Sequence, residues 1–250
     1  YHAGAEVGQG SHTVFAQFTA EALGLPIEKV ELHLSDTATS RNSGSVSASR
    51  MTFMAGNAIS GAAQQALERW QAGDRPAVGD FVYRPPATSP MDKADGHCYP
   101  NFAYGYVAEA VLAEVNTQTG EVRLKNVICA DDVGKAINPR LVEGQIEGAI
   151  VQAAGYTLME NFITQKGKTL TKELSTYLIP TSADIPEHVE SLILEYPDPI
   201  GPYGARGMGE MPYLPFVPAV IDAVYQAIGI RFNTFPLTAE AVLRGLGKIN

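Results

Sequence analysis

The segment from Gly204 to Pro212 constrains this chain most, because it sets three glycines within six residues directly before one carboxylate, Glu210. Glycine adopts backbone conformations that side chains forbid, so the segment predicts a tight turn. Apolar residues then recur at spacings of three, four and seven, at Val217, Val220, Ile221, Val224 and Ile228. Pro215 and Pro218 suit the first turn of such a helix. We therefore predict that Glu210 lies on a loop at, or just before, a helix N-terminus.

Two interpretations of Glu210 fit this local pattern. A carboxylate held by a rigid backbone is a candidate general base. A solvated glutamate in a first helical turn, favoured by the helix dipole, gives the same pattern. Local spacing alone favours the second interpretation, so the rest of the chain has to decide between them.

Composition excludes several classes of protein. With 250 residues, 45% of them hydrophobic, the chain can form one large domain or two lobes. A net charge of −9 argues against broad nucleic-acid binding and against an anionic membrane surface. Cys98 and Cys129 form no CxxC motif, so no zinc or iron–sulfur signature is present. Without a signal peptide or a long apolar run, we expect a cytoplasmic protein with no membrane contact.

A second glycine-rich turn, Gly8-Gln9-Gly10, lies near the start of the sequence. Residues 14–25 carry apolar side chains on one side and predict an amphipathic helix, which Ser11 or Thr13 could cap. A turn that leads into a helix presents free N–H groups, which suit a phosphate or another anion. Many such turns bind no ligand, so this signal is weak by itself.

A hydroxyl-rich stretch, residues 35–49, follows an alternating segment at 29–34 that predicts a strand. Small side chains mark the next predicted helix, residues 50–69, and allow another element to approach closely. One interpretation of the stretch is a flexible linker. The other places its hydroxyls at the buried start of a packed helix, where they meet an anionic ligand. The two interpretations stay open.

Residues 71–101 predict a long surface loop and the boundary between two lobes, 1–100 and 101–250. Beyond it, residues 103–115 and 121–131 predict a β-hairpin. Asn138 and Pro139 predict the start of a helix that ends near residue 158. Glycine and glutamine share one face of that helix, at Gly144, Gln145, Gly148, Gln152 and Gly155. That face is either solvated or pressed against a polar ligand. Shorter elements are predicted as strands at 162–163, 170, 177–179 and 189–196 and as a helix at 238–246.

Four motifs occur in a fixed order: Glu6–Gly10, Ser45–Ser49, Gly144–Gly148 and Gly207–Glu210. With the run Asp131–Pro139, they resemble the C-terminal half of the molybdopterin-binding subunit of the xanthine dehydrogenase family, the molybdenum hydroxylases. The resemblance covers nearly the whole chain. It implies an α+β fold with mixed sheets and helices in two lobes of a molybdopterin-binding domain. The first lobe would hold the Gly-Gln-Gly turn and the Ser-rich loop, and the second the Gln-bearing helix and the catalytic Glu loop.

The resemblance also implies roles for the turn near the start and for the later helix. Gln9 would hydrogen-bond near the molybdenum and its dithiolene. Val7, Gly8 and Gly10 would hold the pyranopterin through their backbone. Gln145 would contact the pterin from its helix. Because the dithiolene sulfurs hold the metal, the protein would supply no metal ligand.

The remaining implied roles belong to the Ser-rich loop and to the glutamate loop. Val46, Ser47 and Ser49 would contact the pterin or the phosphates of a dinucleotide form, the cytosine dinucleotide being common in bacterial members. Glu210 would be the base beside the molybdenum, and Arg206 matches the Lys or Arg of relatives. Burial would raise the pKa of Glu210 and a helix N-terminus would lower it. The sequence leaves that balance open.

The implied activity is hydroxylation of an N-heterocycle or an aldehyde with oxygen from water. The family's earlier half of this subunit has no counterpart here, and the sequence starts at Tyr1. We therefore expect a fragment, a processed chain or one piece of an assembly that is active only with partners. Those partners would be a chain with the missing half, an iron–sulfur subunit and an FAD subunit.

Two alternative functions compete with this one. A non-catalytic scaffold subunit would keep the fold and lose the cofactor, but Gln9, Gln145 and Glu210 are intact, and metal analysis would decide. An unrelated nucleotide-binding protein ranks lower, because the chain has neither G-x-x-x-x-G-K-[ST] nor G-x-G-x-x-G.

Overall fold

The computed structural model describes all 250 residues as two compact units, and three separate stretches of chain build each unit. The first unit comprises Tyr1–Tyr106, Asp132–Val142 and Ile193–Gly209. The second unit comprises Val107–Asp131, Glu143–Leu192 and Glu210–Asn250. Helices and mixed β-structure confirm the predicted α+β class. The assignment of cofactor-binding lobes to residues 1–100 and 101–250 stays a prediction.

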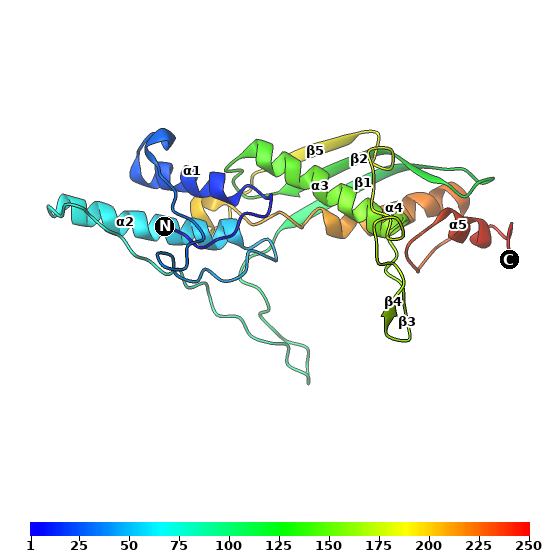
Figure 1. The fold of residues 1–250 in the computed structure, drawn as a ribbon, viewed down its shortest axis with the longest axis horizontal. Coiled ribbons are helices and arrows are strands. Elements are labelled where there is room, and N and C mark those ends of the chain that lie inside the picture. Colours follow the sequence, from blue (N-terminus) through cyan, green and yellow to red (C-terminus); the bar gives the residue numbers. More distant parts are fainter. The chain divides into compact units, whose positions relative to one another are not determined.

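Two helices, α1 (Ser11–Leu23) and α2 (Met51–Gln71), pack side by side in the first unit (Figure 1). Both predicted helices are thus confirmed. The predicted strand at 29–34 is wrong: η1 (Ile27–Lys29) takes up its start, and only Leu34 forms a bridge, with His2. Its alternating apolar residues instead pack against a core that α1 and α2 share. Residues 72–105 form the expected long loop, with one isolated bridge.

The main sheet has the order β1 (Tyr106–Val115), β2 (Val122–Asp132) and β5 (Val189–Leu194). The first two strands are the predicted hairpin. The N–H of Val127 donates to the carbonyl of His188, and six residues later the N–H of Val133 donates to the carbonyl of Leu194. Residue numbers therefore increase together along the paired segments of β2 and β5. These two strands therefore run parallel and need a crossover connection, which contains helix α3 (Pro139–Leu158).

Three helices of the C-terminal half follow the predicted pattern. Asn138 Oδ1 accepts a hydrogen bond from the N–H of Leu141 at the start of α3 (3.2 Å). Helix α4 (Tyr213–Ile228) and helix α5 (Ala239–Gly245) confirm the other two predictions. Pro218 lies inside α4 rather than in its first turn. Fully buried side chains of the second unit come from its sheet and helices, and they include Val127, Ile146, Ile150, Phe216, Val220, Val224 and Val242.

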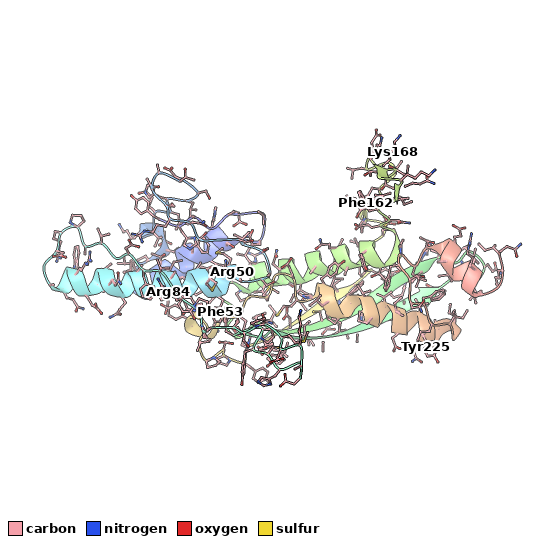
Figure 2. All side chains as sticks on the ribbon, turned by 90° about the horizontal axis from the view of Figure 1, so that it is seen from below. Arg50, Phe53, Arg84, Phe162, Lys168 and Tyr225 are labelled. Carbon is pink, nitrogen blue, oxygen red and sulfur yellow. The ribbon has the colours of Figure 1, made fainter.

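A short hairpin, β3 (Thr164–Gln165) and β4 (Lys168–Thr169), projects from the second unit, with Lys168 on it and Phe162 in the segment that leads into it (Figure 2). Predicted strands at 162–163, 170 and 177–179 are wrong, because those residues form bends and irregular loop. The short 3-10 helix η2 (Pro202–Gly204) belongs to the first unit. No helix of this chain combines the length and the apolarity that crossing a membrane requires.

Candidate functional site

The Gly-Gln-Gly turn is closed by the carboxylate of Glu6. Its Oε1 accepts hydrogen bonds from the N–H groups of Gly8 (3.0 Å) and Gly10 (2.8 Å), and its Oε2 accepts one from His12 (3.0 Å). The N–H groups of both glycines, which the sequence pattern left free for a ligand, are therefore occupied by the chain itself. The expected cap by Ser11 or Thr13 is wrong, because the N-cap residue is Gly10, which has no side chain to cap the helix.

Charge explains why Glu6 suits this position. Burial alone would raise the pKa of Glu6, but the hydrogen bonds from His12, Gly10 and Gly8 together lower it below its ordinary value. The carboxylate lies where the partial positive charge of α1 is greatest. Glu6 thus replaces the Ser or Thr cap and supplies the anion that the sequence pattern assigned to a ligand.

The Gln9 side chain is also engaged within the turn. Its Oε1 accepts a hydrogen bond from the N–H of Val7 (2.7 Å). Its Nε2 donates to the carbonyl of Ala5 (2.9 Å) and to the hydroxyl of Ser11 (2.8 Å). One lone pair of the amide oxygen remains for a further donor, because a carbonyl oxygen accepts two hydrogen bonds.

The Ser-rich loop carries a cation instead of an anion. Arg50 Nη1 donates to the carbonyl oxygens of Ser45 (2.6 Å) and Ser43 (3.4 Å). The hydroxyls of Ser45 and Ser47 lie 2.6 Å apart. Buried hydroxyls of Ser40 and Ser43 have no hydrogen-bond partner in the chain. Such groups are costly unless a ligand or water satisfies them, so this loop is not a plain solvated linker.

Both loops lead into helices that share one core. Phe15, from α1, forms a buried cluster with Met51 and Ala55, from the first turns of α2. Val46 of the Ser-rich loop packs against the same cluster. The start of α2 and an early turn of α1 therefore lie together. Two predicted binding segments, far apart in the sequence, are brought to one region of the first unit.

Gly207 brings a third predicted segment to the Ser-rich loop. A Cβ atom at Gly207 would lie 1.4 Å from the carbonyl oxygen of Ser49, which leaves no room for any side chain. Ala48 and Ser49 have left-handed backbone angles, φ 60° and 52°. That conformation costs about 1–2 kcal/mol per residue outside glycine, and the close packing against Gly207 is one contact that can hold it.

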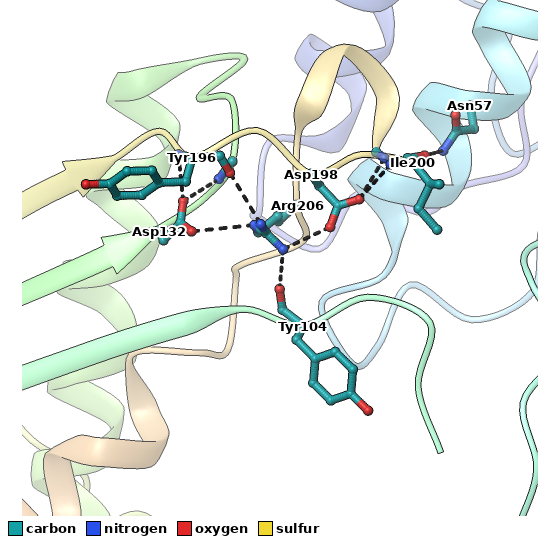
Figure 3. A network of polar contacts seen from close by, with 9 residues as sticks. Asn57, Tyr104, Asp132, Tyr196, Asp198, Ile200 and Arg206 are labelled. Carbon is teal, nitrogen blue, oxygen red and sulfur yellow. Dashed lines mark hydrogen bonds and ion pairs between the residues drawn. The ribbon is translucent and has the colours of Figure 1, made fainter. Parts of the chain in front are cut away.

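Arg206 fixes the backbone just before Gly207 (Figure 3). Its Nη1 donates to Asp198 Oδ2 (2.8 Å) and to the carbonyl of Tyr104 (2.6 Å), and its Nη2 donates to the carbonyl of Tyr196 (3.3 Å). Its Nε lies 3.7 Å from Asp132 Oδ2. All three charged side chains of this network are nearly buried, so removing the cation would leave two carboxylates without compensation.

The last two predicted residues, Gln145 and Glu210, belong to the second unit. Gln145 is half-buried on α3, and the glycines beside it, Gly144 and Gly148, have open space where a side chain would be. Glu210 lies in an exposed turn that ends two residues later at Pro212, the N-cap of α4. The predicted position just before a helix is confirmed. The first unit contains the other seven predicted residues: Val7, Gly8, Gln9, Gly10, Val46, Ser47 and Ser49.

Sequence reasoning missed three residues that shape these loops: Glu6, Arg50 and Asp198. Glu6 precedes the turn by two residues, and a carboxylate at that distance can fold back onto a helix start. Arg50 ends a hydroxyl-rich loop, where a cation favours an anionic ligand. Asp198 had no local signal, because its partner Arg206 is set by tertiary packing alone.

A separate titratable cluster lies on β1 and β2. Burial raises the pKa of Glu109 to about 7, the hydrogen bond with Cys129 opposes the rise, and Asp131 adds to it. Burial, followed by the nearby Glu109 and Asp131, also raises the pKa of the Cys129 thiol. The cluster belongs to the second unit and includes none of the predicted site residues.

Comparison with known proteins gives consistent matches. A sequence model of the molybdopterin cofactor-binding domain matches residues 1–80 and 70–186. The probable hypoxanthine oxidase of Escherichia coli (strain K12) is 30% identical over 98% of this chain and 29% of its own length. A probable xanthine dehydrogenase subunit of Bacillus subtilis (strain 168) is 30% identical over 97% of this chain and 37% of its own length.

Among solved structures, the aldehyde oxidoreductase from Desulfovibrio desulfuricans has a TM-score of 0.87 and 30% identity. The match covers 95% of this chain and 28% of that chain. The sequence therefore spans about a third of the length of the relatives that it matches.

Proposed function

Since the chain belongs to the molybdopterin cofactor-binding domain of the xanthine dehydrogenase family of molybdenum hydroxylases, we propose that it forms part of a catalytic molybdenum subunit. The reaction would be hydroxylation of an N-heterocycle or an aldehyde with oxygen from water. The close contact of Gly207 with Ser49 carries the proposal, because it joins the Ser-rich loop to the segment that leads to Glu210. Residues 1–100 and 101–250 would supply one cofactor-binding lobe each.

The residues present fit a polar, anionic organic cofactor. Buried hydroxyls of Ser40 and Ser43 lack partners. The hydroxyls of Ser45 and Ser47 lie 2.6 Å apart, and the Arg50 guanidinium donates to the carbonyl oxygen of Ser45. Hydroxyl groups and a guanidinium are common partners of phosphate. Gly207 allows a backbone approach that any side chain would block.

When bound, molybdopterin supplies a sulfur-ligated molybdenum centre that takes up the two electrons released when a substrate carbon is hydroxylated. Val46, Ser47 and Ser49 would hold its pterin or phosphate groups. Gln9 would donate or accept a hydrogen bond near the dithiolene, and Gln145 would contact the pterin from α3.

The backbone of the turn would act through carbonyl groups. The N–H groups of Val7, Gly8 and Gly10 are already used inside the turn. Their carbonyl oxygens are the backbone atoms that would accept hydrogen bonds from the N–H groups of a pterin.

Glu210 would act as the general base. Its carboxylate oxygen would accept a proton from the water that supplies the hydroxyl oxygen, which typically contributes about 10²–10⁴-fold to the rate. The turn before α4 holds the backbone of Glu210.

The names of the relatives indicate the type of carbon that is hydroxylated, and not a particular substrate. One relative is named for hypoxanthine, an N-heterocycle, and a structural neighbour is named for aldehydes. An electron-poor carbon bonded to nitrogen or oxygen is common to both. We infer the same type of carbon for this protein.

The rest of the assembly is inferred in the same way. One relative is named as a subunit, so a complex of several chains is the expected form. A chain or segment corresponding to the unmatched two thirds of the relatives would complete the pocket. Iron–sulfur and FAD subunits would carry electrons away, and the cofactor would have the cytosine dinucleotide form.

Glu210→Gln tests the catalytic role in the purified complex. We expect hydroxylation of purines, pyridines or aldehydes to fall by about 10²–10⁴-fold, with molybdenum and nucleotide content near wild type. Glu190→Gln, an exposed glutamate on β5, serves as the control and should keep full activity. Retained turnover in Glu210→Gln would remove Glu210 from the role of base. A wild-type complex without molybdenum would instead favour the scaffold function.

A further inference from the structure

We propose that Glu6 is a positioning residue that closes the N-terminus of α1 to anions, so that the phosphate of the cofactor binds away from this helix and the Gly-Gln-Gly turn receives an uncharged polar part of it. The closure concerns only this chain's own residues. The statement about the cofactor rests on the proposed function.

The N–H groups of both glycines of the turn and of His12 are not available to an external anion. A phosphate at a helix N-terminus binds the backbone N–H groups of the turn and of the first helical residues. Here the N–H groups of Gly8, Gly10 and His12 all point to the Glu6 carboxylate, at 2.8–3.0 Å. Gln9 occupies the N–H group of Val7. A phosphate that binds these three N–H groups would have to displace the Glu6 carboxylate. At any other N–H group of this helix start it would meet the negative charge of that carboxylate.

The same contacts set the shape of the turn. Gly8 and Gly10 have positive φ angles of 105° and 83°, and a side chain at Gly10 would collide with Leu141. Glu6 holds both glycine N–H groups with one oxygen atom. By fixing them, it directs the remaining lone pair of the Gln9 amide and the carbonyl oxygens of the turn. Glu6 therefore acts on a ligand through its neighbours and not by contact.

The Ser-rich loop provides the independent contrast. There a guanidinium covers carbonyl oxygens, and hydroxyl donors remain without partners. An anion is repelled by the Glu6 turn and attracted by the Arg50 loop, and the two loops lead into helices with a shared core. This charge difference favours one orientation of a cofactor with one anionic end: the anionic end lies at the Arg50 loop and the uncharged end at the Glu6 turn.

Wild-type protein labelled with ¹⁵N-glycine, with any partner chains it purifies with, gives the first test. At neutral pH, inorganic phosphate should leave the Gly8 and Gly10 amide signals unmoved. On acidification both signals should shift together in one transition below the ordinary pKa range of glutamate, because Glu6 is their common acceptor. The charged group that acts on Glu6 from α1 is His12, and its charge also lowers the pKa of Glu6. Phosphate-dependent shifts in the wild type, or no common acid transition, would overturn the proposal.

Glu6→Ala should open the helix start. We expect its Gly8 and Gly10 amides to shift with inorganic phosphate and to saturate, with an apparent affinity on the order of tenfold tighter than wild type. Glu21→Gln removes one charge from the same helix without touching the turn, and it should behave as wild type. A folded Glu6→Ala variant that ignores phosphate would overturn the proposal. If that variant fails to fold, Glu6→Gln, which keeps one carbonyl oxygen, must meet the same expectation.

These outcomes are separate from those of the proposed function. Protein without molybdenum whose glycine amides behave as expected would refute the proposed function and keep the closure by Glu6. Molybdenum-loaded protein whose wild-type turn responds to phosphate would do the reverse.

Discussion

The Gly-Gln-Gly turn and the Ser-rich loop both precede a helix of the first unit, but different parts of the chain hold them. Every side-chain hydrogen bond of the turn comes from residues within six positions of their partners, chiefly Glu6 and Gln9. The Ser-rich loop is held locally by Arg50 and from far along the sequence by Gly207. One loop is locally organised, and the other depends on tertiary structure.

The difference teaches how sequence motifs should be interpreted. A glycine-rich turn before a helix is usually taken as an anion site, yet here the chain supplies the anion itself. A serine-rich stretch is usually taken as a linker, yet here unpaired hydroxyls and a cation favour an anionic ligand. The residue that decides the charge lies next to each motif and not among its glycines or serines.

Arg206→Met should give the largest effect, on the network that holds the backbone before Gly207 and thereby supports the Ser-rich loop. It leaves Asp132 and Asp198 buried without their cation, which typically costs about 3–5 kcal/mol. Denaturant unfolding of the full chain measures that loss. Arg231→Met removes an exposed pair and should cost less than about 1 kcal/mol. Equal losses in the two variants would contradict the buried network.

Gly207→Ala tests the contact from the other side. The added Cβ meets the carbonyl of Ser49, and we expect a loss of about 1–3 kcal/mol in the free energy of unfolding. Amide signals of residues 45–50 should shift, while those of Gly8 and Gly10 stay in place. Gly144→Ala is the control, because its Cβ enters open space on a helix and should be neutral or slightly stabilising. Shifts in the turn would show that the turn, too, depends on tertiary contacts.

Much of the fold was predictable, because periodicity and turn residues specify local structure. The helices at α1, α2, α3 and α4 and the β1–β2 hairpin have strong patterns of this kind. The strand predicted at 29–34 failed because alternation shows that one face is buried, and a strand also needs a neighbouring strand. The Arg206 network had no local pattern at all. The guanidinium of Arg206 meets Asp132 from a distant part of the sequence and Asp198 from nearby, and this meeting depends on tertiary packing.

The smallest expected effect concerns the stability that Glu6 gives the turn. Because hydrogen bonds lower its pKa in the folded state, its contribution is complete above the ordinary glutamate pKa and is lost as pH falls through the folded value. At neutral pH, Glu6→Gln should cost about 0.5–1 kcal/mol, and the difference from wild type should shrink under acid.

Glu109 has the opposite pH dependence. Its pKa is raised to about 7 in the folded state, so its contribution to folding stability is lost as pH rises through that value. Only the difference between wild type and Glu6→Gln at each pH isolates Glu6, because the Glu109 contribution cancels in it. A difference that grows as pH falls would mean that the carboxylate is not the charged cap of α1. The Gly-Gln-Gly turn would then no longer differ from the Ser-rich loop in carrying a carboxylate where the loop can bind an anionic ligand.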